Sequence, residues 1–112
     1  MTTSTAMCCP AVFATPLDED QAVELAEVLK ALADPARLRL ISIIAASPGG
    51  EACACDLHGP LERSQPTVSH HLTQLTRAGI ISREQRGKWA WFQINDQRIA
   101  AICDSLSPLG CR

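Results

Sequence analysis

The most constraining feature of this sequence is a short amphipathic segment between Ser64 and Gly79. Its apolar residues recur at positions i, i+4 and i+7, the spacing of one helix face: Val68, Leu72 and Leu75. Ser64 is a favourable N-cap residue, and Pro66 is tolerated in a first helical turn. Gly79 is a typical C-cap residue. The segment is therefore predicted to be a helix that begins after Ser64, ends at Gly79 and packs one face on a core.

The other face of this predicted helix is polar. At 100° per residue it presents His70, Thr73 and Arg77, flanked by Thr67, Ser69 and Gln74. A polar outer face is common on surface helices. It therefore indicates DNA reading only in combination with a basic element nearby in the chain.

Two segments with alternating apolar residues come after this helix, 80–85 and 88–94, with Arg86 and Gly87 between them as the predicted hairpin turn. Within the second segment, Ala90, Phe92 and Ile94 share one face and the two tryptophans share the other. The chain has a net charge of −2, but five basic residues and one acidic residue give +4 between Arg63 and Lys88. A basic hairpin in an acidic protein indicates a directed contact with a polyanion.

Further helices are expected on both sides of this block. One begins at Asp18 and carries an apolar stripe through Leu32; the next is capped by Asp34 and ends at 47–50; a short third one covers 52–61. A last helix opens at Asp96 and ends at Pro108. The order predicts a mainly α fold with a β-hairpin, a winged helix-turn-helix over residues 17–107, preceded by an N-terminal arm (1–16) and succeeded by a short tail (108–112).

Several classes of protein are disfavoured. The sequence has no Cys-x-x-Cys redox pair in a βαβ setting, no Gly-rich phosphate loop and no paired carboxylates on one face, so an enzyme is not predicted. No apolar run approaches the roughly 20 residues that span a bilayer. The first residues lack the basic and apolar regions of a signal peptide. We therefore expect a cytoplasmic protein that does not contact membranes.

The six cysteines are best interpreted as thiols, since a reducing cytosol disfavours a disulfide framework. Cys53 and Cys55 stand close together in the chain, with His58 shortly after them. Cys8 and Cys9 are adjacent in the arm, where they have no packing role. Cys103 falls on the apolar stripe of the last predicted helix and is expected to be a core residue.

Several motifs together resemble the ArsR/SmtB family of dimeric metalloregulatory repressors. They are Leu29–Leu40 (LKALADPARLRL), Cys53–Leu57 (CACDL), Ser64–Leu72 (SQPTVSHHL), Ala78–Ile80 (AGI) and Arg86–Trp89 (RGKW). The resemblance covers about Val23 to Ile94. The motif Cys-x-Cys-Asp-Leu is similar to that of the arsenic and antimony sensors and of the related cadmium and lead sensors.

This resemblance implies a prokaryotic homodimer, built on the first and last helices, that binds an inverted repeat in operator DNA and is released by an inducer. It places DNA contacts on Gln65, Ser69 and His70, with Thr67 beside them. Pro66 stands where the family often has a small polar residue. The outer face and the basic hairpin add the remaining expected contacts: Thr73, Gln74, Arg77, Arg83, Arg86 and Lys88.

The inducer expected from the resemblance is As(III) or Sb(III), held by Cys53 and Cys55. Thiolate sulfur selects soft ions over magnesium, calcium or manganese. Trivalent arsenic takes three thiolates, and Cys8 or Cys9 from the arm is the first candidate for the third, with Cys111 or His58 as less favoured donors. Cd(II), Pb(II) or Zn(II) with four ligands, or cysteine oxidation without any ion, remain alternatives.

The spacing of Cys53 and Cys55 makes one further demand. Residues i and i+2 of an undistorted helix lie about 200° apart, so both thiols can hold one ion only if the predicted helix 52–61 is extended or distorted at its start. Such a distortion would act on the predicted helix between Ser64 and Gly79, which comes next in the chain and is expected to read DNA. Metal binding and DNA binding would therefore compete.

Overall fold

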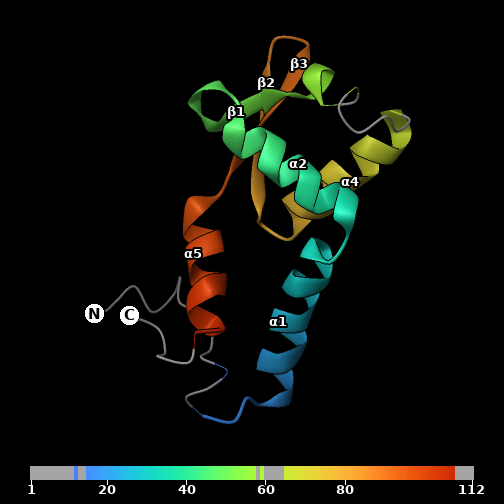
Figure 1. The fold of residues 1–112 in the computed structure, drawn as a ribbon. Coiled ribbons are helices and arrows are strands. Elements are labelled where there is room, and N and C mark those ends of the chain that lie inside the picture. The colour runs from blue at the N-terminus through green and yellow to red at the C-terminus, as the bar shows by residue number, and fades with distance from the viewer. Residues whose placement is uncertain (1–11, 13–14, 58, 60–64, 108–112) are drawn as a thin grey trace. The chain divides into compact units, whose positions relative to one another are not determined.

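A computed structural model of the chain describes residues 12, 15–57, 59 and 65–107 (Figure 1). Its helices and strands are α1 (Glu19–Leu32), α2 (Pro35–Ala46), β1 (Glu51–Cys53), α4 (Gln65–Arg77), β2 (Ile81–Arg86), β3 (Trp89–Ile94) and α5 (Asp96–Ser105). Two 3₁₀ turns, η1 (Pro48–Gly50) and η2 (Ala54–Asp56), flank β1. The chain forms two compact units: Lys30–Asn95, and Met1–Leu29 together with Asp96–Arg112.

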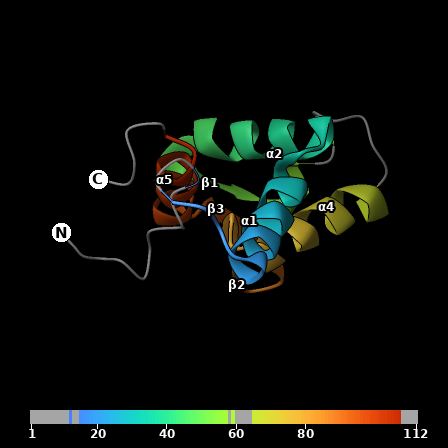
Figure 2. The same ribbon diagram turned by 90° about the horizontal axis from the view of Figure 1, so that it is seen from below.

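The Lys30–Asn95 unit is built on a three-stranded antiparallel sheet with the order β1-β3-β2. β1 pairs with β3 so that Glu51 faces Gln93 and Cys53 faces Trp91. Helix α2 packs on β1 and β3 and also contacts α4, which in turn packs on β2 (Figures 1 and 2). The buried core of this unit contains Leu40, Ile44, Leu57, Val68, Leu72, Leu75, Ile80, Ile81 and Phe92.

Helix α2 begins where the sequence predicts. The side chain of Asp34 accepts hydrogen bonds from the backbone N–H groups of Ala36 and Arg37 at 2.8 and 3.3 Å, and Pro35 occupies the first turn. The helix ends at Ala46 with Ser47 as its C-cap, within the expected region 47–50 for its end. Leu40 and Ile44 of this helix are buried, whereas Leu38 is 53% exposed.

Helix α4 confirms the predicted amphipathic segment. After Arg77 the backbone N–H of Gly79 donates to the carbonyl of Thr76, and that of Ile80 donates to the carbonyl of Leu75. Gly79 has φ +78°, so these bonds form a Schellman C-cap, the ending that the glycine predicts. The expected cap Ser64 lies outside the described residues.

Two sequence predictions about this unit are wrong in detail. The expected helix 52–61 is absent at its start, where residues 51–53 form a strand and 54–56 a 3₁₀ turn. The third strand arises because β3 offers an edge on which these few residues complete backbone hydrogen bonds. The hairpin turn is also shifted by one residue: Arg86 pairs with Trp89, so Gly87, with φ +62°, and Lys88 form the loop.

In the second unit, α1 begins with a reciprocal cap. The backbone N–H of Asp18 donates to Gln21 Oε1 at 3.1 Å, and that of Gln21 donates to Asp18 Oδ1 at 2.8 Å. The predicted start at Asp18 is thus confirmed. The buried residues of α1 are Leu25, Val28 and Ala31. None of the helices that the structure describes is long and apolar enough to cross a bilayer.

Helix α5 ends at Ser105, earlier than the expected Pro108, and buries Ala101, Ile102 and Ser105. Cys103 is exposed, so its predicted place in the core is wrong. The buried face of α5 is therefore rotated away from Cys103 relative to the predicted apolar stripe.

Candidate functional site

The outer face of α4 is open, as the sequence predicts for a helix that reads DNA. Ser69, His70, Thr73 and Arg77 are exposed, whereas Thr67 and Gln74 are half-buried. Gln65 is the first residue of the helix. The hydroxyl of Thr73 donates to the carbonyl of Ser69 at 2.9 Å, which leaves its oxygen lone pairs as acceptors toward the outside.

The two adjacent histidines of α4 have separate roles. His70 is exposed, while His71 is buried and its Nδ1 accepts a hydrogen bond from Nε of Arg37 at 3.0 Å. Arg37 also donates to the carbonyl of Ala31 at 3.3 Å. His71 therefore joins α4 to the beginning of α2, and only His70 is presented on the outer face.

The cap of α2 belongs to the same cluster. Partial burial tends to raise the pKa of Asp34, but the backbone N–H groups of Ala36 and Arg37, with the positive charges nearby, outweigh burial and hold the pKa below its usual value. The capping carboxylate is therefore ionised at neutral pH.

The basic residues of the hairpin, expected to act as a wing, differ in their surroundings. Arg83 and Lys88 are exposed, and Nη2 of Arg83 donates to Oε1 of Gln85 at 2.6 Å. Arg86 instead donates from Nη1 and Nη2 to the two carboxylate oxygens of Glu51, at 3.0 and 2.7 Å. It also binds Glu84.

Further contacts hold this arginine in place. Its guanidinium lies 4.8 Å from the ring centre of Trp91, and Glu51 accepts another hydrogen bond from Gln93 at 2.9 Å. The hydrogen bonds from Arg86 and then Gln93 lower the pKa of Glu51 to about 2. The carboxylates raise the pKa of Arg86 above its usual value. Arg86 is thus an organising residue of the wing as well as an expected DNA contact.

This ion pair has no signature in the sequence. Glu51 and Arg86 are 35 residues apart, and only the pairing of β1 with β3 brings them together. The alternation of side chains in the hairpin could have indicated that Trp91 lies next to Arg86. It could not have indicated the carboxylate of Glu51.

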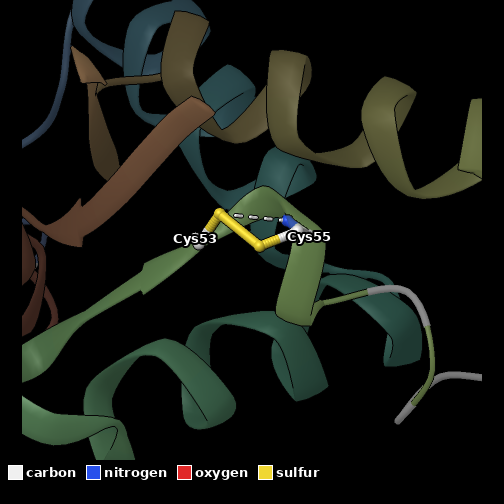
Figure 3. The surroundings of a disulfide bond; sticks show 2 residues. All are labelled: Cys53 and Cys55. Carbon is white, nitrogen blue, oxygen red and sulfur yellow. Dashed lines mark hydrogen bonds between the residues drawn. A yellow bond between two sulfur atoms is a disulfide. The ribbon is translucent and has the colours of Figure 1, made fainter. Parts of the chain in front are cut away.

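Cys53 and Cys55 are brought together at the junction of β1 and η2 (Figure 3). Cys53 has an extended backbone, with φ −76° and ψ 142°, and the next residues turn into the 3₁₀ conformation. The Cα atoms are 5.2 Å apart, and Figure 3 shows the two sulfur atoms facing each other, joined as a disulfide. The backbone N–H of Cys55 points at the Cys53 sulfur, 3.4 Å away. Both sulfurs therefore lie on one side without any helix being distorted.

The two cysteines differ in accessibility. The side chain of Cys53 is 3% exposed, while Cys55 is exposed to solvent. Two adjacent sulfurs form part of a donor set for a soft ion, since thiolates favour such ions. Among the described residues, no group of three or more His, Cys, Asp and Glu side chains is arranged to hold a metal. The other expected donors, Cys8, Cys9, Cys111 and His58, lie outside the described residues.

Two open pockets adjoin these features. One, of about 320 Å³, is largely apolar and lies between the outer face of α4 and the sheet, where Ser69, Thr73 and Arg77 meet Arg83 and Phe92. The other, of about 450 Å³, is polar and is lined by Ala54, Cys55, Arg83, Gln85, Lys88, Trp89 and Ala90. Arg83 lines both pockets, so the exposed cysteine and the outer face of α4 share one basic neighbour.

Comparison with known proteins agrees with this arrangement. Residues 34–83, from the cap of α2 into β2, match the arsR family of bacterial regulatory proteins. The chain is 39% identical over 84 residues to an uncharacterized HTH-type transcriptional regulator of Methanocaldococcus jannaschii, a match that covers 75% of this chain and 92% of that protein. It is 34% identical over 84 residues to an arsenical resistance operon repressor of Staphylococcus aureus, with 75% and 78% covered.

A solved structure shows the same fold. A homodimeric winged helix-turn-helix DNA-binding domain from Mycobacterium bovis is similar over 80% of this chain and 83% of its own, with a TM-score of 0.64 and 22% identity. This likeness shows the predicted mainly α winged helix-turn-helix fold, with β2–β3 as the wing hairpin. The chain belongs to the arsR family and is a DNA-binding transcriptional regulator.

Proposed function

We propose that this regulator is a repressor that releases its operator when trivalent arsenic or antimony binds to Cys53 and Cys55, and that it controls a metalloid resistance or efflux operon. The observation that carries the proposal is the placement of both sulfurs on one side of the β1–η2 junction. The arsenical resistance operon repressor among its relatives supports the same ligand.

Reduced, the two cysteines supply two of the three thiolates that As(III) or Sb(III) prefers. Cys8 or Cys9 is the proposed third protein donor, ahead of Cys111 and His58. Cd(II), Pb(II) and Zn(II) would need a fourth ligand. Titration with arsenite, cadmium and zinc, monitored by ultraviolet thiolate absorption, separates these ions; cadmium or zinc binding far more tightly than arsenite would contradict the metalloid assignment.

DNA is read by the open face of α4. We assign base contacts to Gln65, Ser69 and His70, and supporting contacts to Thr67, Thr73, Gln74 and Arg77. In the wing, Arg83, Arg86 and Lys88 are the proposed phosphate contacts. Because Arg86 already binds Glu51 and Glu84, its share of the phosphate contact is smaller than that of Lys88.

The active species is proposed to be a homodimer formed through α1 and α5, bound to an inverted repeat with half-sites about one helical turn apart. Two large apolar side chains in this unit, Val23 and Leu106, are 47% and 42% exposed, as expected of residues covered by a second copy. A monomeric Val23→Glu variant in analytical ultracentrifugation would support this interface, and an unchanged dimer would contradict it.

The coupling between inducer and DNA runs through the sheet in this proposal. Cys53 ends β1, and β1 is paired with the wing strand β3. Glu51, at the other end of β1, binds Arg86 at the tip of the wing. Metalloid binding that moves the end of β1 therefore acts on the wing, rather than by distorting a third helix as the sequence predicts. The coupling free energy of such a switch is typically about 1–3 kcal/mol.

The decisive test is release of operator DNA by arsenite, measured by fluorescence anisotropy on the reduced full-length protein. Cys53→Ser and Cys55→Ser are each expected to keep DNA binding and lose release by arsenite. Cys103→Ser is the matched control, because Cys103 is exposed on α5 and plays no part in the proposed sensor. Release of the Cys53→Ser protein at the wild-type arsenite concentration would refute the proposal.

A thiol redox switch is a second candidate, favoured by the disulfide that joins Cys53 and Cys55 in the structure. In this case an oxidant such as peroxide would convert two thiols to the disulfide and release DNA without any ion. Release by peroxide in the presence of a chelator, reversed by dithiothreitol, supports the switch; unchanged DNA binding in the oxidised protein contradicts it.

A further inference from the structure

The pocket beside Cys55 combines a soft nucleophile with positive charge. Cys55 is exposed and lines this pocket together with Arg83 and Lys88, while its partner Cys53 is buried. An incoming ligand therefore meets Cys55 first and Cys53 second. Trp89, 51% exposed, adds an apolar wall.

The register of the hairpin directs Arg83 to this pocket, and Lys88 lines it from the loop. Side chains alternate along β2, so Arg83 and Gln85 share one face while Glu84 and Arg86 share the other. In the part of the chain that the structure describes, the ion pairs of the wing involve Arg86, and neither Arg83 nor Lys88. The carboxylate nearest in sequence, Glu84, is held by Arg86 on the opposite face. The pocket thus suits an anion that carries a soft atom.

We propose that the inducer arrives as a complex of the trivalent metalloid with small anionic thiols, and that one of these thiols is retained as the third sulfur ligand, its carboxylate bound by Arg83 and Lys88. This inference rests on the proposed metalloid sensing by Cys53 and Cys55. The carrier thiol would take the third position that is assigned above to Cys8 or Cys9, so the two are alternative donors for the same position.

The chemistry is ligand exchange without oxidation or reduction. The thiolate of Cys55 forms a bond to arsenic and one carrier thiolate leaves, taking up the proton that Cys55 gave. Cys53 then displaces a second carrier thiol in the same way. Two As–S bonds form and two break, arsenic stays trivalent, two free thiols are released, and the third carrier sulfur remains bound.

This geometry also links the inducer to DNA release. Arg83 and Lys88 are exposed cations of the wing and proposed contacts to phosphate. A carboxylate bound between them neutralises the charge that attracts DNA, so carrier and operator compete for the same side chains. A metalloid held by an uncharged thiol would fill the sulfur site but release DNA less effectively.

The test uses the reduced full-length protein carrying Cys8→Ser, Cys9→Ser and Cys111→Ser, so that no terminal cysteine can complete the site. Arsenite is pre-mixed with glutathione, which carries carboxylates, or with cysteamine, which carries a positive charge. Native mass spectrometry is expected to show one arsenic with one retained glutathione. Binding from the glutathione mixture should be about tenfold tighter than from the cysteamine mixture, as two exposed ion pairs allow.

The matched variant replaces Arg83 and Lys88 by glutamine. It should lose the preference for glutathione while still binding arsenic from cysteamine, because both cysteines remain. Arsenic bound without a retained thiol, or equal binding from both mixtures, overturns this inference alone. No arsenic on the protein from either mixture, with the same result for the wild-type chain, would overturn the proposed metalloid sensing as well.

Discussion

The carboxylate of Glu51 and the guanidinium of Arg86 form a two-point ion pair that ties the strand ending at Cys53 to the tip of the wing. Arg86 is therefore partly neutralised before DNA arrives, whereas Lys88, close to it in the turn, is exposed. Two basic residues that look equivalent in the sequence are thus in different electrostatic states.

The salt dependence of DNA binding should separate these two residues. Lys88→Ala is expected to weaken binding to all sequences alike and to reduce the slope of log K against log salt by about 1. Arg86→Ala should reduce the slope by less, because its charge is shared with Glu51 and Glu84. Anisotropy titrations from low to moderate salt measure both slopes; a larger change for Arg86→Ala would show that the ion pair opens on DNA.

The ion pair itself can be tested by a double-mutant cycle. Glu51→Gln and Arg86→Gln should each lower the free energy of unfolding, and the double variant should lose less than the sum of the two, because either change alone removes the same bonds. Urea unfolding at neutral pH measures the three variants. Glu84→Gln with Arg86→Gln is the comparison cycle, and strictly additive losses for Glu51 and Arg86 would mean that the pair contributes nothing in solution.

Base reading by His70 predicts a loss that depends on sequence. His70→Ala should weaken binding to the operator by about 1–3 kcal/mol and leave binding to random DNA nearly unchanged, since a base contact carries sequence information and a phosphate contact does not. Lys88→Ala serves as the control that weakens both. An equal loss on operator and random DNA for His70→Ala would count against base reading.

The sequence predicts those features whose cause is local. The cap by Asp34, the outer face of α4 and the turn at Gly79 each depend on a few neighbouring residues, and each is found. The resemblance to the ArsR/SmtB family rests on several such local motifs, and the family match over residues 34–83 confirms it.

The features that the sequence does not predict depend on distant partners. Residues 51–53 become a strand because β3, some 40 residues later, offers an edge, and this alone removes the predicted helix at Cys53 and Cys55. In the sequence Arg86 is predicted only as a DNA contact, because the charges counted between Arg63 and Lys88 do not include its partner Glu51. Cys103 is exposed although its neighbour Ile102 is buried, because adjacent residues of a helix point about 100° apart.

The stability contributed by Asp34 should depend on pH. Its pKa is lowered in the folded protein, so the contribution is complete above the unfolded value of 3.8 and is lost as the pH falls through the lower folded value. The charged groups that face it are Arg37 and, when protonated, His71. Asp34→Ala should cost about 0.5–2 kcal/mol at pH 7.

Asp34→Asn is the matched control, because asparagine caps a helix nearly as well but carries no charge. Urea unfolding from acidic to neutral pH should show the difference between wild type and Asp34→Asn shrinking as the pH falls. A difference that stays constant over this range would mean that the pKa of Asp34 is the same in the folded and unfolded states.

The C-terminal end of α4 can be tested through Gly79. Gly79 has φ +78°, a left-handed conformation in which a side chain costs about 1–2 kcal/mol. Its N–H and that of Ile80 complete the C-cap of α4, so Gly79→Ala should lower the free energy of unfolding by this amount and weaken operator binding by loosening the last turn. Gly59→Ala is the control, because Gly59 has no positive φ and open space around its Cα. Thermal or urea unfolding of the two variants checks the difference, and an equal effect of both substitutions would show that the left-handed turn is not what the glycine provides.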